Sequence, residues 1–166
     1  NSISHARHFE NQNLRFMIHD MRDPLTERYN VIFNLFTSFG YFDREETNAR
    51  VLRNFKLGLH ENGHVVIDFL NLAKVRAELI PSQKLVKQEV EYKINKSITD
   101  QFIIKDIEVT DGENQFKFQE KVQALDLEKF ERYSAEAGLK IVKTFGDYSL
   151  NDFSETLSDR LILVLQ

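Results

Sequence analysis

Hydrophobic and polar residues follow one another along this chain in blocks that predict both helices and strands. The most apolar block is Tyr29–Phe36, and a short loop of small and aromatic residues continues from it to Phe42. A strand covered by helices on both faces has this unbroken apolar character, because neither face meets water. Ligands of open α/β sheets bind just beyond the carboxyl ends of such strands. We therefore expect a ligand at Leu35–Phe42.

A helix and a second strand are predicted directly after this loop. Asp43 and Glu46 have the spacing of a capping box, which places the start of a helix here. Apolar residues recur behind them at helical spacing: Val51, Leu52, Phe55 and Leu59. We expect the helix to end near Gly63, which can adopt a left-handed conformation. His64–Leu70 is then a second buried strand, and the βαβ connection predicts that it is parallel to the first.

The N-terminal part predicts a helix and a short strand. Residues 2–10 have the character of a helix that begins close to or before residue 1, and Leu14–Ile18 is a candidate strand. A polar turn at residues 19–24 follows this strand. Asp20 and Met21 after this strand, and Phe36–Phe42 after the next one, are therefore candidate ligand-binding positions at strand ends.

Alternating apolar and polar residues from about residue 84 to residue 124 predict three antiparallel strands with one solvent-facing side. A bulge near Lys105 and Asp106 would bring the apolar residues of the middle strand to one face. Asp111-Gly112 marks the hairpin turn before the last strand. We interpret residues 84–124 as an antiparallel insertion within a single α/β domain that spans residues 1–166.

The last part of the chain predicts a helix and a hairpin. Asp126 is the expected N-cap of the helix, and Gly138 is its expected end. A strand begins at Leu139, and the final strand is Arg160–Leu165. The polar loop between these two strands predicts that they pair in antiparallel fashion.

Composition narrows the class of protein. The 166 residues carry a formal net charge of −4 with both signs interspersed, so no basic stripe indicates a nucleic-acid partner. The absence of cysteine excludes disulfides, thiolate metal sites and a cysteine nucleophile. No apolar run approaches the roughly 20 residues needed to cross a bilayer. We expect a cytoplasmic protein that binds a small molecule or another protein and not a membrane.

One stretch matches a metalloprotease pattern. His60-Glu61-Asn62-Gly63-His64 has the HExxH spacing, which binds zinc only when both histidines lie on one face of a continuing helix. Here a glycine interrupts the motif, so we interpret it as a helix end and turn and expect no metal. A zinc hydrolase stays a third possibility that would require bound zinc. The sequence contains no GxSxG, P-loop or GxGxxG pattern.

Taken in order, four stretches resemble the class I S-adenosylmethionine-dependent methyltransferases of the small-molecule type. These stretches are SISHARHF, LRFMIHDMRDP, YNVIFNLFTSFGYF with the helix and LHENGHVVIDFLN after it, and EKFERYSAEAGLKIVKTFGDYSL with RLILVLQ. The resemblance implies an α/β fold with a Rossmann-like methyltransferase sheet. This chain would supply strands three to seven with their helices, plus the three-stranded antiparallel insertion.

The chain departs from the family at its start. The family's glycine-rich cofactor loop and the acidic residue that binds the cofactor ribose would both lie before Asn1. In the family's strand order, 3-2-1-4-5-7-6, the missing strands would lie between Leu14–Ile18 and Tyr29–Phe36. We therefore expect an N-terminally incomplete domain whose sheet is completed by an upstream segment or by a second chain.

The resemblance also implies a cofactor, a substrate and residues that bind them. The cofactor would be S-adenosylmethionine and the substrate a small-molecule methyl acceptor. Asp20 would accept a hydrogen bond from the adenine amino group, and Met21 would line the adenine pocket. The residues expected to face the methionine part of the cofactor are Asn34, Leu35 and Phe36.

On the substrate side, Phe39, Tyr41 and Phe42 would border the acceptor. Tyr41 and His19 are the nearest titratable candidates for a base that deprotonates it. The chain would then carry the C-terminal two-thirds of a catalytic domain. The alternative is a non-catalytic methyltransferase-like fragment that binds a partner through its exposed sheet edges.

Overall fold

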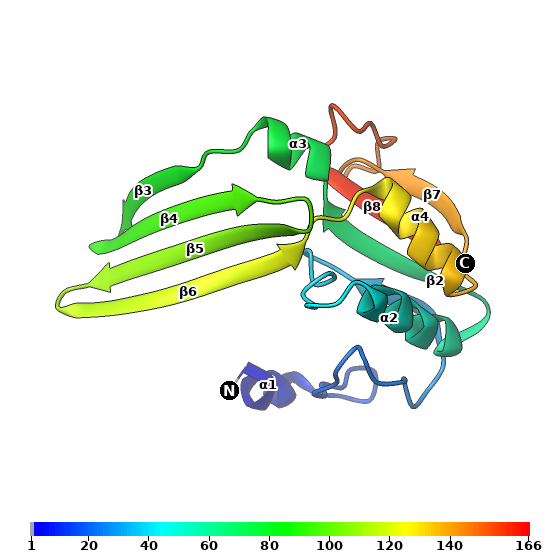
Figure 1. Ribbon diagram of the computed structural model, residues 1–166. Coiled ribbons are helices and arrows are strands. Elements are labelled where there is room, and N and C mark those ends of the chain that lie inside the picture. Colours follow the sequence, from blue (N-terminus) through cyan, green and yellow to red (C-terminus); the bar gives the residue numbers. More distant parts are fainter. Residues whose placement is uncertain (1) are drawn as a thin grey trace.

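The computed structural model describes residues 2–166, which form two four-stranded sheets (Figure 1). The central sheet has the strand order β1-β2-β8-β7. Strand β1 (Tyr29–Asn34) is parallel to β2 (Leu59–Leu70), and β8 (Arg160–Leu165) is antiparallel to both β2 and β7 (Ile141–Phe145). The predicted parallel pair and the predicted C-terminal hairpin are both confirmed.

Two helices, α2 (Glu46–Leu57) and α4 (Leu127–Glu136), cover one face of this sheet (Figure 1). Alternate residues of β2 and β8 point toward them and are fully or nearly fully buried: Val65, Ile67, Phe69, Leu161, Leu163 and Leu165. The predicted cap of α4 is confirmed, because the Asp126 carboxylate accepts from the Lys129 N–H at 2.9 Å. Gly138 ends this segment with φ +71°, as predicted.

The opposite face of the sheet corrects the prediction that Tyr29–Phe36 is buried on both faces. Val31 and Phe33 lie on this face and are 42% and 63% exposed. No helix of residues 2–166 packs over β1 on this side, and β1 is an edge strand whose only ladder partner among the described residues is β2. The apolar run therefore marks a strand that is covered on one side only in this structure.

Both predicted ends of α2 are wrong. The residue before the helix is Glu45, which makes no side-chain capping bond, and Asp43 instead pairs with Lys121 at 3.3 Å. The helix ends at Leu57 and Gly58, so Gly63 lies inside β2. A Cβ atom at Gly63 would lie 3.0 Å from the Asn30 carbonyl oxygen, so the small residue allows β1 to approach closely.

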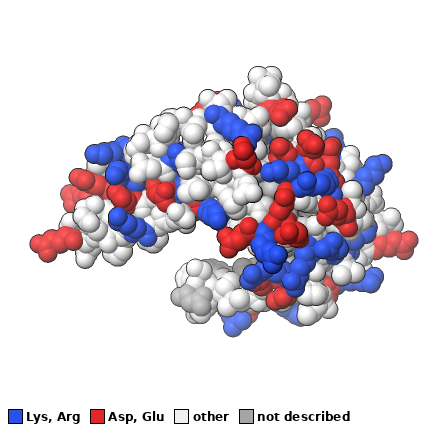
Figure 2. Space-filling view, viewed as in Figure 1, with Lys and Arg blue, Asp and Glu red and all other residues white. Residues whose placement is uncertain are grey.

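The second sheet is inserted between α3 (Leu72–Ala77) and α4 and projects from the body of the molecule (Figures 1 and 2). Its strands are β3 (Ser82–Lys87), β4 (Val90–Ile98), β5 (Phe102–Asp111) and β6 (Asn114–Gln123). Four strands replace the three predicted, because the polar edge strand β3 has little apolar alternation to identify it.

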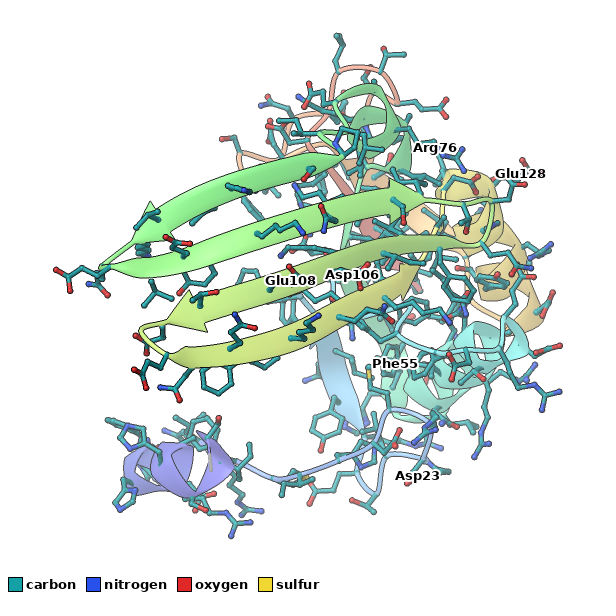
Figure 3. All side chains as sticks on the ribbon, turned by 60° about the vertical axis from the view of Figure 1, so that its left-hand side comes forward. Asp23, Phe55, Arg76, Asp106, Glu108 and Glu128 are labelled. Atoms are coloured by element: carbon teal, nitrogen blue, oxygen red, sulfur yellow. The ribbon has the colours of Figure 1, made fainter. Side chains whose placement is uncertain are left out.

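The predicted bulge near Lys105 and Asp106 is also wrong, because β5 pairs with both neighbours in an unbroken register. Its apolar residues simply occupy both faces. The predicted hairpin turn is confirmed at Gly112, which has φ +59°. Asp106 and Glu108 project from one face of β5 (Figure 3), where Glu108 pairs with Lys93 and Lys117.

The N-terminal region contains α1 (Ser2–Ala6) and a 3-10 turn at Arg7–Phe9, which confirms a helical start. The strand predicted at Leu14–Ile18 is wrong: a single bridge joins Asn11 to Leu14. Ile18 is 76% exposed, and residues 14–18 belong to neither of the two four-stranded sheets. No helix in the described part of the chain is long and apolar enough to cross a membrane.

Candidate functional site

The candidate site lies at the carboxyl end of β1, where the chain makes a tight turn. Phe36 and Thr37 both adopt left-handed backbone conformations, with φ of +57° and +56°. Positive φ is uncommon for residues other than glycine, and for a β-branched residue such as threonine it is a clear outlier. The turn presents the Phe36 ring to solvent, with 77% of the residue exposed. Such a conformation persists only when the surrounding structure holds it.

Asp68 of β2 supplies the main contacts that hold this turn. Its Oδ2 atom accepts from the Phe36 N–H at 2.9 Å, and its backbone carbonyl accepts from the Thr37 N–H at 3.0 Å. Within the turn, the Ser38 hydroxyl donates to the Leu35 carbonyl at 2.6 Å. Asp68 is 1% exposed, so its carboxylate depends on protein partners in place of water.

Two further side chains complete the network around Asp68. Arg160 donates from Nε to Asp68 Oδ1 at 2.8 Å and from Nη2 to the Thr37 hydroxyl at 2.9 Å. Tyr148 donates its hydroxyl to Asp68 Oδ2 at 2.9 Å. Partial desolvation, together with this bond to the carboxylate, raises the pKa of Tyr148. The buried charge is therefore paired and hydrogen-bonded on both oxygens.

Our reading of the sequence missed this network, although a signal was present. Asp68 is the single charge within the apolar run His64–Leu70, and Arg160 opens the apolar strand of the terminal hairpin. Opposite charges in two buried strands are expected to pair, because burying either one alone is costly.

The turn at residues 19–23 lies beside the end of β1. Met21 accepts at Sδ from Asn34 Nδ2 at 3.1 Å, and its carbonyl accepts from Asn54 Nδ2 at 3.1 Å. These bonds attach the turn to both β1 and α2. Asn34 is 6% exposed, and its Oδ1 atom has no hydrogen-bond partner in the described part of the chain.

Asp20 in the same turn forms a bidentate ion pair with Arg22. Oδ2 lies 2.6 Å from Nη2, and Oδ1 lies 3.0 Å from Nε. Hydrogen bonds from the Arg22 side chain and backbone lower the pKa of Asp20 to about 2. The carboxylate is therefore ionised near neutral pH and able to accept hydrogen bonds.

An open depression of about 350 Å³ brings several of the predicted residues together. It is lined by Asp20, Arg22, Tyr41, Phe42, Asp43, Arg44 and Thr47. Tyr41 is 51% exposed here, whereas Phe42 is partly buried against the core. Asp20, from the predicted cofactor side, thus shares one surface with Tyr41 and Phe42 from the predicted substrate side.

Six of the predicted residues do not line this depression: His19, Met21, Asn34, Leu35, Phe36 and Phe39. Phe39 is fully buried in the core, where its ring lies 5.6 Å from that of Phe130, so the expectation that it borders a substrate does not fit. His19 is exposed and donates from Nε2 to the Asp23 carbonyl at 3.2 Å, outside the residues that line the depression.

The HExxH stretch is not arranged as a metal site. His60 and Glu61 are exposed on β2, at the end of the strand opposite to Asp68. Within residues 2–166, no group of three or more histidine, aspartate or glutamate side chains is placed to hold a metal ion. The described structure therefore offers no support for a zinc hydrolase.

Comparison with solved structures identifies the fold. A S-adenosylmethionine-dependent methyltransferase from Clostridium acetobutylicum ATCC 824 shares 17% identity and a TM-score of 0.79, over 93% of this chain and 66% of that one. The CcbJ methyltransferase from Streptomyces caelestis shares 16% identity and a TM-score of 0.79, over 91% and 66%. CalS10, an amino pentose methyltransferase from Micromonospora echinaspora in its SAM-bound form, shares 15% identity and a TM-score of 0.61, over 89% and 62%.

The chain therefore has the fold of the S-adenosylmethionine-dependent methyltransferases, which confirms the predicted fold class and the resemblance on which it rested. It spans just under two thirds of the length of these structures. No family model and no curated protein matches the sequence.

Proposed function

We propose that the native protein, with whatever segments or subunits accompany this chain, transfers a methyl group from S-adenosylmethionine to a small-molecule acceptor. The observation that supports the proposal is the arrangement at the carboxyl end of β1, where exposed Phe36 and ionised Asp20 lie on loops joined through the Met21–Asn34 bond. In open α/β folds this edge of the sheet is where ligands bind.

The residues present fit the chemistry of this cofactor. Asp20 offers an ionised acceptor for the adenine amino group, although Arg22 would have to share it. The orphaned Asn34 Oδ1 atom is a buried acceptor that suits the ammonium group of the methionine part. Leu35 and Phe36 are 37% and 77% exposed and can cover the apolar parts of the ligand.

The cofactor supplies the chemistry when it is bound, as a methyl group on a sulfonium. Asp20, Asn34, Leu35 and Phe36 would hold the cofactor, which would supply an electrophilic methyl group to the nucleophilic atom of the acceptor. The role of this chain is to orient the acceptor and exclude water. Tyr41 and Phe42 would border the acceptor. A base, if one acts, would be Tyr41 or the Nδ1 atom of His19, since its Nε2 carries a donated proton.

We further propose that another segment or a second chain completes the central sheet. The free edge of β1, together with exposed Val31 and Phe33, leaves backbone groups and apolar side chains uncovered. Met17 and Ile18 are also more than half exposed on the neighbouring N-terminal arm. This chain would then carry the C-terminal two-thirds of the catalytic domain, and the completing strands would bring the remaining cofactor contacts.

Calorimetric titration with S-adenosylmethionine tests both proposals. We expect micromolar binding by the native protein, of the order of −8 kcal/mol, and little or no binding by residues 1–166 alone. Asp20→Ala should weaken binding by the native protein, whereas Asp106→Ala, on the charged face of β5 (Figure 3), should not. Micromolar binding by the isolated chain would refute the need for completion.

The alternative function is a non-catalytic module that binds a partner through its exposed sheet edge. It is favoured by the same uncovered face at Val31 and Phe33. A native protein that binds a partner through β1 but neither binds S-adenosylmethionine nor transfers its labelled methyl group would establish the module and refute the enzyme.

A further inference from the structure

We infer that Asp68 is a positioning residue, which fixes the Phe36–Thr37 turn in the conformation that a ligand at the end of β1 requires. Arg160 is its partner in this role. The identity of the ligand rests on the proposed function, but the positioning itself is a property of the fold. The turn has two consecutive left-handed residues, and neither is glycine.

The contacts of Asp68 go to the atoms that define the turn. Its side chain and its backbone carbonyl bind the N–H groups of Phe36 and Thr37. Arg160 joins Asp68 Oδ1 to the Thr37 hydroxyl, so one guanidinium ties the carboxylate to the turn it holds. An ion pair that served stability alone would have no need to engage both turn residues.

The position of Asp68 explains why this arrangement is rigid. The residue pairs with Ile162 of β8, its neighbour Ile67 pairs with both β1 and β8, and Asp68 is 1% exposed. The turn is therefore anchored to an interior strand of the sheet. Phe36 is consequently displayed at a fixed place, even though 77% of it is exposed.

Asp68→Asn is the direct test, because the amide keeps the shape but can accept at only one atom. We expect faster amide hydrogen exchange at Phe36 and Thr37. We also expect a dissociation constant for S-adenosylmethionine in the native protein that rises about tenfold or more. Arg160→Lys is a milder companion that keeps the buried charge but lacks the planar fork, and it should show the same effects to a smaller degree.

Glycine provides a rescue that a purely structural role would not produce. In Thr37→Gly the glycine adopts positive φ without a steric penalty, so the turn depends less on its contacts with Asp68. We expect the double variant Asp68→Asn/Thr37→Gly to bind S-adenosylmethionine more tightly than Asp68→Asn does, while the thermal midpoint stays below that of the wild type.

A matched control exists elsewhere in the chain. Glu45 also binds an arginine and a tyrosine hydroxyl, those of Arg132 and Tyr133, but it contacts no residue of the turn. Glu45→Gln should leave both the exchange at Phe36 and the affinity for S-adenosylmethionine unchanged.

Unchanged exchange at the turn in Asp68→Asn, or an affinity that the glycine does not restore, would overturn the positioning role. A wild-type protein that binds no S-adenosylmethionine would refute the proposed function. In that case the hydrogen-exchange measurements at Phe36 and Thr37 would decide the positioning role by themselves.

Discussion

At the scale of single residues, the loop after β1 depends on Gly40. This glycine has φ +83°, and a Cβ atom there would lie 3.2 Å from Val122 Cγ2 and 3.4 Å from Leu125 Cδ1. The left-handed conformation and the close approach of β6 both require a residue without a side chain. Gly40 therefore joins the candidate site to the base of the inserted sheet.

Gly40→Ala should lower the free energy of unfolding by about 1–3 kcal/mol, because backbone strain and overpacking act together. Gly112→Ala is the matched control, since its φ is +59° and nothing lies within 4 Å of the added methyl group. Urea unfolding of the two variants separates the cost of backbone strain, which both variants share, from the cost of overpacking, which only Gly40→Ala has. Equal losses would contradict a packing role for Gly40.

A second residue-scale feature joins α2 to α4. The hydrogen bond from the Tyr133 hydroxyl, with Arg132 adding its charge, lowers the pKa of Glu45. Burial, followed by the bond to Glu45, raises the pKa of Tyr133 to about 12. The two shifts have opposite consequences for stability as pH changes.

The Tyr133 contribution is fully present below its unfolded pKa of about 10 and is lost as pH rises toward its folded pKa. The difference in unfolding free energy between wild type and Tyr133→Phe should therefore become less favourable to the wild type between pH 10 and about 12. Denaturant unfolding at fixed pH values measures it. A difference that does not change over this range would show that the shift is absent.

The Glu45 contribution has the reverse sign. It is present above the unfolded pKa of about 4.3 and is lost as pH falls below that value toward the lower folded pKa. Glu45→Gln should thus flatten the acid limb of the stability curve. If wild type and variant lose stability in parallel below pH 5, the pairing contributes nothing.

At the scale of elements, the predictions that succeeded rested on local signals. The start of α4 at Asp126 and the left-handed Gly138 are decided within a few residues, and so is the hairpin turn at Gly112. The predicted start of α2 was wrong. Asp43 forms an ion pair with Lys121 of β6, a contact between distant parts of the chain that no local pattern contains. Gly63 likewise serves the approach of β1 and does not end a helix.

The cap of α4 gives a prediction at this scale. Asp126→Ala should cost about 1 kcal/mol of unfolding free energy, because it leaves the Lys129 N–H without its acceptor. Asp126→Asn keeps an oxygen acceptor and should cost clearly less. Thermal or urea unfolding of the two variants measures the difference, and equal costs would mean that the charge matters more than the hydrogen bond.

At the scale of the whole molecule, the sequence pattern predicted the class of fold and the parallel pair but not how the sheet is covered. The pattern of apolar residues does not identify the element that packs on a given face of a strand. In residues 2–166 the face of β1 that carries Val31 and Phe33 is uncovered. The Asp68 network was missed for a related reason: its members come from β2, β8 and two loops, which only the folded chain brings together.

Phe33→Ser tests whether this open face is covered in the native protein. In the isolated chain, where Phe33 is 63% exposed, the change should alter the unfolding free energy by no more than about 0.5 kcal/mol. In the native protein the same change should cost about 2 kcal/mol or more, as expected for loss of a buried aromatic. Equal small effects in both would argue that nothing covers β1.

The most direct test of the central claim is to map where S-adenosylmethionine binds, by following backbone amide chemical shifts of the native protein during a titration. We predict that the largest changes fall on Asp20, Met21 and the 34–36 stretch, with none at the tip of the inserted sheet around Gly112. Changes confined to the inserted sheet or to His60–His64, or no changes at saturating cofactor, would contradict the account.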